Sequence, residues 1–189
     1  MKIAILAWGS LIWDPRTLKF DITVGWVANG PKLPIEFARI SGDGRLTLVI
    51  KEGCVEVQTY YGISLYSEID EAVLDLALRE GCQKKRIGII NKTERFDVKF
   101  SNSIHDRIYS WLSNNKDIDA VIWTDLRSNF NDKLGFEFTE TQALNYLKYL
   151  NLDTKILAEE YIRKAPKEIN SALRQMIENE FKWYSIERL

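Results

Sequence analysis

The sequence predicts an α+β fold, because strands with short turns dominate the chain up to Leu65 and helices dominate it from Thr139. Apolar, β-branched runs broken by glycine and proline are typical of strands. Leucine and isoleucine at intervals of three and four after Thr139 are typical of helices. We therefore expect an α+β domain over residues 1–135, with residues 136–189 as a helical extension packed on that domain.

Composition narrows the class of protein. A chain of 189 residues with 46% apolar and 28% charged residues is typical of one globular domain. Its net charge is −1, with both signs interspersed, so we expect no nucleic-acid partner and no membrane association. We expect no signal peptide, and Cys54 and Cys82 have neither metal-site nor disulfide spacing. We therefore expect a cytoplasmic protein without a metal.

The N-terminal strand is predicted to lead into a structured loop. Residues 3–7 are apolar, the run breaks at Gly9 and Ser10, and it stops at Asp14. Trp8 and Trp13 would anchor the loop at its two ends. Glycine permits a positive φ or a close approach to a bound group, and consecutive N–H groups can form an anion-binding nest. The alternative is a simple turn with hydrophobic packing.

Three further strands are expected before residue 66, over residues 33–41, 45–50 and 55–65. The first two would form a hairpin through Gly42-Asp43-Gly44. Alternation places Ile35 and Phe37 on one face and Glu36 on the other. The third strand would be interrupted at Gly62.

A helix is predicted over residues 67–81, with Ser67 as its N-cap. Glu80 falls near the middle of its apolar stripe, together with Ile69, Val73, Leu76 and Ala77. Beyond it we expect strands at 87–90, 96–100 and 120–126, and a helix at 103–112. Three more helices follow: one capped by Thr139 and Gln142, one capped by Asp153 that carries Ile156, Leu157 and Tyr161, and one after Pro166 with a stripe from Ile169 to Phe181.

Glu80 is the strongest candidate for chemistry. A carboxylate on an apolar face is destabilised in its charged form, which is typical of a general acid/base. The alternative is an ion pair with Arg79, Lys84 or Lys85, or exposure at the helix end.

Other polar residues are weaker candidates. Arg39 and Arg45 flank the hairpin turn and could bind a substrate carboxylate, or could pair across the hairpin with Glu36 or Asp43. Ser41 is a further possible substrate contact. His105 is the only histidine and belongs to no catalytic or zinc pattern, so we interpret it as structural.

Two motifs carry a resemblance to a known family. Trp8-Gly9-Ser10-Leu11-Ile12-Trp13 resembles the Tyr-Gly-Ser-Leu-Ile-Trp loop of the γ-glutamylcyclotransferase-like superfamily, especially its glutathione-degrading branch. Arg79-Glu80-Gly81 resembles the family's helix end, where the glutamate is the catalytic acid/base. The resemblance implies a small, mixed, barrel-like sheet with surrounding helices.

The resemblance also implies an activity. In this family the α-amine of a γ-glutamyl group attacks its own γ-carbonyl and releases 5-oxoproline, without a metal or organic cofactor. Glu80 would move the proton, and the backbone amides of Trp8, Gly9, Ser10 and Leu11 would bind the substrate's polar end or the oxyanion. Trp8 replaces the family's tyrosine and lacks its hydroxyl. A non-catalytic ligand-binding or protein-interaction module on the same fold is the alternative, and either could form a homodimer.

Overall fold

The computed structural model describes residues 1–93 and 103–186, and the chain divides into two compact units. The first unit contains Met1–Ala7, Asp14–Leu33 and Gln58–Asp125. The second contains Trp8–Trp13, Pro34–Val57 and Leu126–Leu189. Each unit is built from three separate segments of the chain. Residues 135 and 136, between which the domain boundary was expected, both belong to the second unit.

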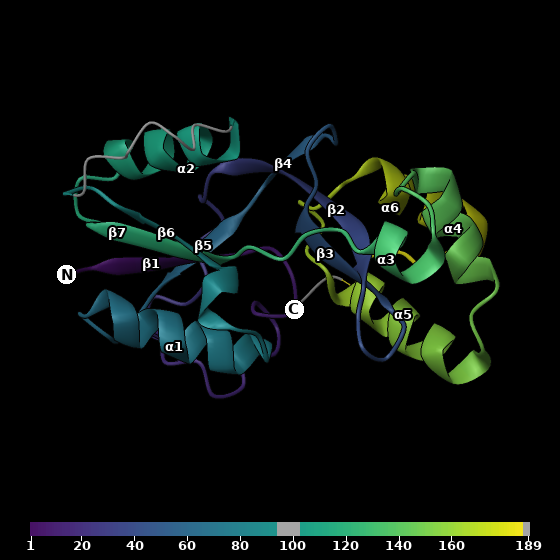
Figure 1. The fold of residues 1–189 in the computed structure, drawn as a ribbon, viewed down its shortest axis with the longest axis horizontal. Coiled ribbons are helices and arrows are strands. Elements are labelled where there is room, and N and C mark those ends of the chain that lie inside the picture. The colour runs from purple at the N-terminus through teal and green to yellow at the C-terminus, as the bar shows by residue number, and fades with distance from the viewer. Residues whose placement is uncertain (94–102, 187–189) are drawn as a thin grey trace. The chain divides into compact units, whose positions relative to one another are not determined.

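The first unit is built on a four-stranded sheet with the order β5-β1-β7-β6. β1 runs parallel to β7 and antiparallel to β5, while β6 runs antiparallel to β7. Two helices, α1 and α2, cover opposite faces of this sheet (Figure 1). The elements are β1 (Ile3–Ala7), β5 (Tyr60–Ile63), β6 (Ile87–Asn91), β7 (Ala120–Thr124), α1 (Ile69–Glu80), α2 (Ser103–Asn114) and the short 3₁₀ helix η1 (Lys84–Arg86).

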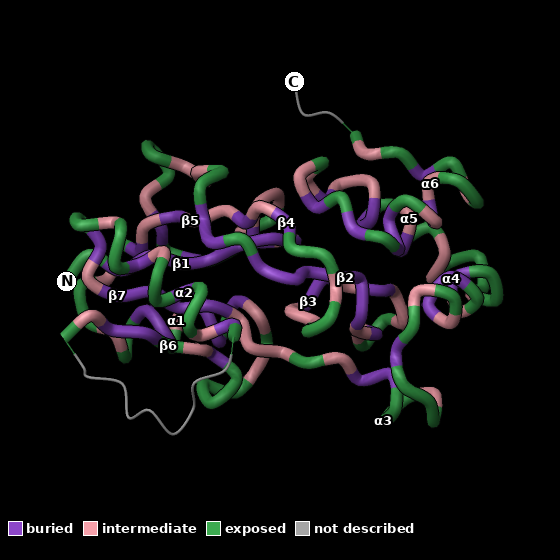
Figure 2. Tube along the Cα trace, turned by 90° about the horizontal axis from the view of Figure 1, so that it is seen from above, coloured by how far each residue is buried: buried purple, intermediate pink, exposed green. Residues whose placement is uncertain are grey.

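The two central strands form the core of the first unit. All five residues of β1 are buried, as are four of the five in β7 (Figure 2). Strands covered by helices on both faces read as continuous apolar runs, because neither face meets water. The prediction of two buried strands here is confirmed.

The expected strand over residues 55–65 is broken at Thr59 and not at Gly62. β4 (Glu56–Gln58) ends before Thr59, and β5 begins after it. The Thr59 hydroxyl is buried and donates to Pro31 O at 2.5 Å, which fixes the chain where it leaves one sheet for the other. Gly62 lies inside β5, where a Cβ would come within about 3.1 Å of the rings of Phe20 and Trp26. The absence of a side chain at Gly62 therefore lets the two rings pack against β5.

The second unit contains β3 (Leu46–Ile50) and, from Pro34 on, β2 (Lys32–Ile40), which form a hairpin in a sheet of order β3-β2-β4. The hairpin prediction is confirmed, with Ile40 opposite Leu46. Glu36 is as fully buried as Ile35 and Phe37, so β2 is covered on both of its faces. The N-terminus of α6 (Ala172–Phe181) covers Glu36 through Ser171 and Leu173.

Three more helices complete the second unit: α3 (Phe130–Leu134), α4 (Glu140–Lys148) and α5 (Leu152–Lys164). Thr139 caps α4 as predicted, with its hydroxyl accepting from Gln142 N at 3.2 Å. Asn151, and not Asp153, caps α5, because its side chain accepts from Thr154 N at 2.9 Å. The buried face of α5 is also shifted: Ala158, Tyr161 and Ile162 are buried, whereas Ile156 and Leu157 are exposed.

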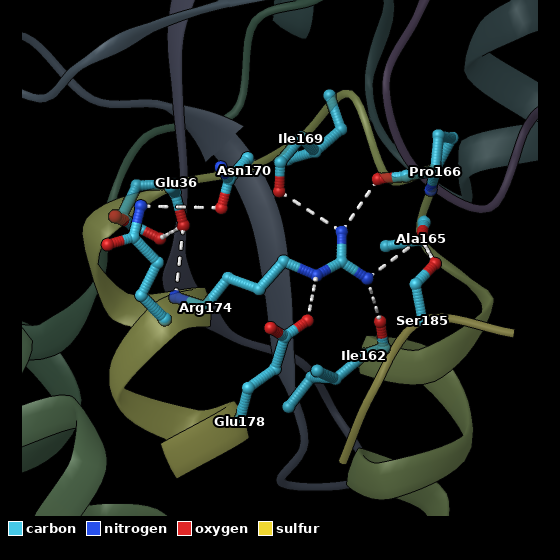
Figure 3. A network of polar contacts seen from close by, with 11 residues as sticks. Glu36, Ile162, Ala165, Pro166, Ile169, Asn170, Arg174, Glu178 and Ser185 are labelled. Atoms are coloured by element: carbon cyan, nitrogen blue, oxygen red, sulfur yellow. Dashed lines mark hydrogen bonds and ion pairs between the residues drawn. The ribbon is translucent and has the colours of Figure 1, made fainter. Parts of the chain in front are cut away.

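Arg174 joins α6 to the end of α5 (Figure 3). Its buried guanidinium donates to Pro166 O and Ile169 O from Nη1, and to Ile162 O and Ala165 O from Nη2, at 2.6–3.1 Å. The last carbonyls of a helix have no partner within the helix, so an outside donor is needed when they are buried. Arg174 supplies that donor.

The expected α+β class is confirmed, but the described strands form two open sheets and not one barrel-like sheet. Glu68, and not Ser67, is the N-cap of α1. The expected strand at 96–100 lies outside the described residues. Over residues 1–93 and 103–186, no helix combines the length and the apolar character that a bilayer crossing requires.

Candidate functional site

The loop Trp8–Trp13 is anchored at both ends, as the sequence predicts. Trp8 is buried, and its indole Nε1 donates to Leu48 O at 3.3 Å. Trp13 packs edge-on against Tyr161, with ring centroids 5.2 Å apart. Between these anchors the chain closes a turn, because Ile12 N donates to Gly9 O at 3.0 Å. The loop is therefore held in a defined conformation.

Gly9 has a packing role that the sequence left open. A Cβ on Gly9 would lie 2.7 Å from the Tyr161 hydroxyl oxygen. That oxygen also accepts from Leu48 N at 3.3 Å, which fixes the tyrosine under the loop. The backbone of Gly9 does not have a positive φ. Glycine is needed here because a side chain of the same protein comes close.

The turn between β2 and β3 contains the other predicted substrate contacts. Arg39 Nη1 donates to Arg127 O at 2.8 Å. The Ser41 hydroxyl lies 2.5 Å from Asp43 Oδ1 and 2.9 Å from Arg45 O. Burial disfavours the charged form of Asp43, but the hydrogen bonds from Ser41 and Arg45 N outweigh it and lower the pKa of this carboxyl. Arg39 and Ser41 thus have intramolecular partners.

Arg45 connects this turn to Tyr161. Its Nε is 3.3 Å from Asp43 Oδ2, which is the cross-hairpin pair expected as the alternative to substrate binding. Its guanidinium also lies over the Tyr161 ring, 5.2 Å from the centroid. The loop and the turn therefore contact the same tyrosine, which the sequence did not single out.

Glu80 ends α1 in the first unit and is followed by Gly81 in the left-handed conformation, with φ of 63°. Arg79 Nη1 is 2.5 Å from Glu80 Oε1, and Arg79 Nη2 donates to Asp14 O. The Arg79 side chain is 4% exposed and that of Glu80 is 17% exposed. The ion pair that the sequence offered as the alternative for Glu80 is present, and Arg79 takes the more buried position.

The predicted site residues are divided between the two units. Trp8, Gly9, Ser10, Leu11, Arg39 and Ser41 belong to the second unit, and Glu80 belongs to the first. Within the second unit, Tyr161 joins the loop to the hairpin turn through Gly9 and Arg45. Within the first, Arg79 joins Glu80 to Asp14, which follows the loop directly in the sequence.

Two surface pockets lie elsewhere. One, of about 490 Å³, is lined by α4 and its neighbours and includes Tyr146 and Tyr149. The other, of about 420 Å³, lies in the first unit and includes Lys2 and Tyr61. The predicted catalytic and substrate-binding residues line neither of these two pockets.

A cluster of possible metal ligands was missed from the sequence. The ligand atoms of Glu36, Cys54 and Glu140 lie within 4.8 Å of one another. Burial raises the pKa of the Cys54 thiol to about 11, and the charges of Glu36 and Glu140 add to this effect. Burial also raises the pKa of Glu36, against the hydrogen bonds it accepts. No spacing pattern marks these three residues in the sequence, because they lie on β2, in the loop after β3 and at the start of α4.

The chain matches no protein-family model, and no curated protein or solved structure matches it significantly. Its functional assignment therefore rests on the two motifs and on the geometry within each unit.

Proposed function

We propose that the chain is a γ-glutamylcyclotransferase-like enzyme that releases 5-oxoproline from a γ-glutamyl amine or amino acid, on a fold of that family's type. The substrate's α-amine attacks its γ-carbonyl, a new C–N bond closes the five-membered ring, and the bond to the leaving amine breaks. The attacking amine loses a proton and the leaving amine gains one, so a single acid/base can serve both steps. The two sequence motifs support this reaction class.

The fixed carboxylate of Glu80 is the observation that carries the proposal. Arg79 holds it at 2.5 Å, and the 17% exposure of Glu80 leaves the carboxylate reachable. The ion pair fixes the position of the carboxylate, and a general acid/base must be held within reach of the proton that it transfers. Arg79 also binds Asp14 O, at the end of the Trp8–Trp13 loop in the sequence. The same arginine thus connects Glu80 to Asp14 within the first unit.

In this proposal the backbone amides of Trp8, Gly9, Ser10 and Leu11 bind the substrate's polar end or the developing oxyanion. The anchoring of the loop supports it, because oxyanion donors act best when they are fixed in advance. Arg39 and Ser41 are proposed to contact a substrate carboxylate. A substrate would have to compete with their present partners, Arg127 O and the 41–45 turn.

One observation favours the alternative, a non-catalytic ligand-binding or protein-interaction module. Glu80 has a structural role, because its carboxylate forms an ion pair with the buried Arg79. A buried arginine left without its carboxylate would be costly, so the pair is explained without catalysis.

The test is release of 5-oxoproline, measured by mass spectrometry after incubation with glutathione and a panel of γ-glutamyl amines and amino acids. We expect product from the wild type and a loss of at least about 100-fold in kcat for Glu80→Gln, the usual contribution of a general acid/base. Glu71→Gln, an exposed carboxylate on the same helix, is the matched control and should leave the rate unchanged.

Two outcomes would count against the enzyme. Full activity in a folded Glu80→Gln variant would remove the proposed acid/base. Absence of product from every substrate, with ligand binding still detected by calorimetry, would favour the binding module.

A further inference from the structure

Three side chains that the proposed reaction does not use converge in the second unit. Glu36 lies on β2, Cys54 lies in the loop after β3, and Glu140 is the first residue of α4. Their ligand atoms are within 4.8 Å of one another. Glu36 is fully buried, whereas Cys54 and Glu140 are partly exposed, so the cluster can be reached from solvent.

We propose that Glu36, Cys54 and Glu140 bind a divalent metal ion of the zinc type. Thiolate sulfur selects a borderline-soft ion, while Mg²⁺ and Ca²⁺ prefer oxygen ligands only. Three protein ligands leave a fourth tetrahedral position for water. The proposal is independent of the cyclotransferase reaction.

The distances between the three ligand atoms fit a tetrahedral zinc site if the side chains move slightly closer together. With Zn–S of about 2.3 Å and Zn–O of about 2.0 Å, tetrahedral ligand atoms lie about 3.5 Å apart. The observed spread of up to 4.8 Å must therefore shrink by about 1 Å. Cys54 and Glu140 are partly exposed and can rotate toward Glu36. The fully buried Glu36 stays where it is.

Hydrogen bonds hold the Glu36 carboxylate in place, as they commonly hold a carboxylate that binds a metal ion (Figure 3). Its Oε1 accepts from Ser171 Oγ at 2.5 Å and from Phe37 N at 2.9 Å. Its Oε2 accepts from Leu173 N at 3.3 Å. Metal-ligating carboxylates are commonly held by hydrogen bonds of this kind, and each oxygen has more than one lone pair. Oε2 therefore retains capacity for a metal ion.

The carboxylates of the cluster are not neutralised by an ion pair with a basic side chain of the described residues. Among residues 1–93 and 103–186, no basic side chain forms an ion pair with Glu36 or Glu140. Lys51 is the one positive group that acts on Cys54 there, and two carboxylates act against it. Buried charges in proteins are normally paired or coordinate metals. A divalent ion would offset the repulsion between the two carboxylates, and its bond to sulfur would displace the proton of the Cys54 thiol.

Cobalt(II) titration of the chelator-treated, full-length protein tests this proposal, because a thiolate–cobalt bond gives a charge-transfer absorption. We expect one cobalt per chain, displaced by zinc. Cys54→Ser should abolish the charge-transfer band, and Glu140→Gln should weaken cobalt binding at least about 10-fold. Cys82→Ser and Glu137→Gln are the matched controls and should change neither. Glu36→Gln is unsuitable, because Glu36 also holds the N-terminus of α6.

Thermal melts of the same variants show whether each is folded. A wild type without the band, or a band that survives in folded Cys54→Ser, would overturn the proposal. Unchanged affinity in Glu140→Gln would exclude the three-ligand site. Turnover is not a readout here, so failure of this site and failure of the proposed enzyme are separate results.

Discussion

Tyr161 is the residue that holds the Trp8–Trp13 loop in place. It contacts Gly9, packs against Trp13 and lies under Arg45. The sequence alone does not show why a glycine follows a strand. An anion-binding nest, a positive φ and a close packing contact each favour glycine at such a position. The structure assigns Gly9 to close packing, since its φ is not positive and the tyrosine hydroxyl occupies the space.

Gly9→Ala should therefore destabilise the protein by about 1–3 kcal/mol, the usual effect of overpacking a buried contact. The added methyl would lie 2.7 Å from the Tyr161 oxygen. Gly42→Ala is the control, because its Cβ would meet open space at an ordinary φ, and it should change stability by less than about 0.5 kcal/mol. Urea unfolding monitored by tryptophan fluorescence measures both.

The cause can be isolated by repeating the substitution in a Tyr161→Phe background. Without the hydroxyl, the nearest ring atom to the added Cβ is 3.8 Å away. The alanine should then cost less than in the wild type. An equal cost in both backgrounds would mean that the strain arises elsewhere.

Among the elements, α5 and α6 show how a buried charge can organise two helices. The guanidinium of Arg174 binds four carbonyls around the end of α5 and the segment before α6. Apolar spacing predicted a stripe from Ile169 to Phe181, and its members Ile169, Leu173 and Ile177 are buried. Arg174 is buried beside them, which apolar spacing alone did not predict.

Arg174→Met should cost about 3 kcal/mol or more of unfolding free energy, because the substitution leaves several buried carbonyls without donors. Arg163→Met is the control. That arginine forms a surface pair with Glu159 at 42% and 37% exposure, and such pairs contribute less than about 1 kcal/mol. Denaturant unfolding separates the two variants, and similar losses would contradict the assigned role of Arg174.

For the molecule as a whole, the units are interleaved along the chain. The strands and loop of the second unit come from the first third of the sequence, and their covering helices come from its end. Glu36 is bound by Ser171 and Leu173, and Trp13 packs on Tyr161. Those partners all lie beyond residue 136.

A fragment of residues 1–135 should therefore leave the second unit unfolded. Its hairpin would expose Glu36, Phe37 and Leu48 without α5 and α6. Backbone amide spectra should show native dispersion for β1, β5 and β7 at most, and collapsed signals for residues 34–57. A fragment with native dispersion throughout would instead support the continuous domain expected from the sequence.

Local patterns determined much of the fold. The apolar runs at Ile3–Ala7 and Ala120–Thr124 predicted two buried strands, and Thr139 with Gln142 predicted the start of α4. The cap could be predicted because it depends on two residues three positions apart, and the strands because continuous apolar runs are typical of strands covered on both faces. The predicted caps at Ser67 and Asp153 were wrong. α1 begins after Glu68, which forms no side-chain cap hydrogen bond, and α5 begins after Asn151, a residue as well suited to capping as Asp153.

The sequence by itself determined the α+β class, most of the elements and the two motifs that motivate the proposed function. Only the tertiary structure decided that Glu80 pairs with Arg79, that Gly9 makes room for Tyr161, and that Glu36, Cys54 and Glu140 converge. Local periodicity reports which face of an element avoids water. It carries no information about which distant side chain meets that face, and most of these contacts join residues from distant parts of the chain.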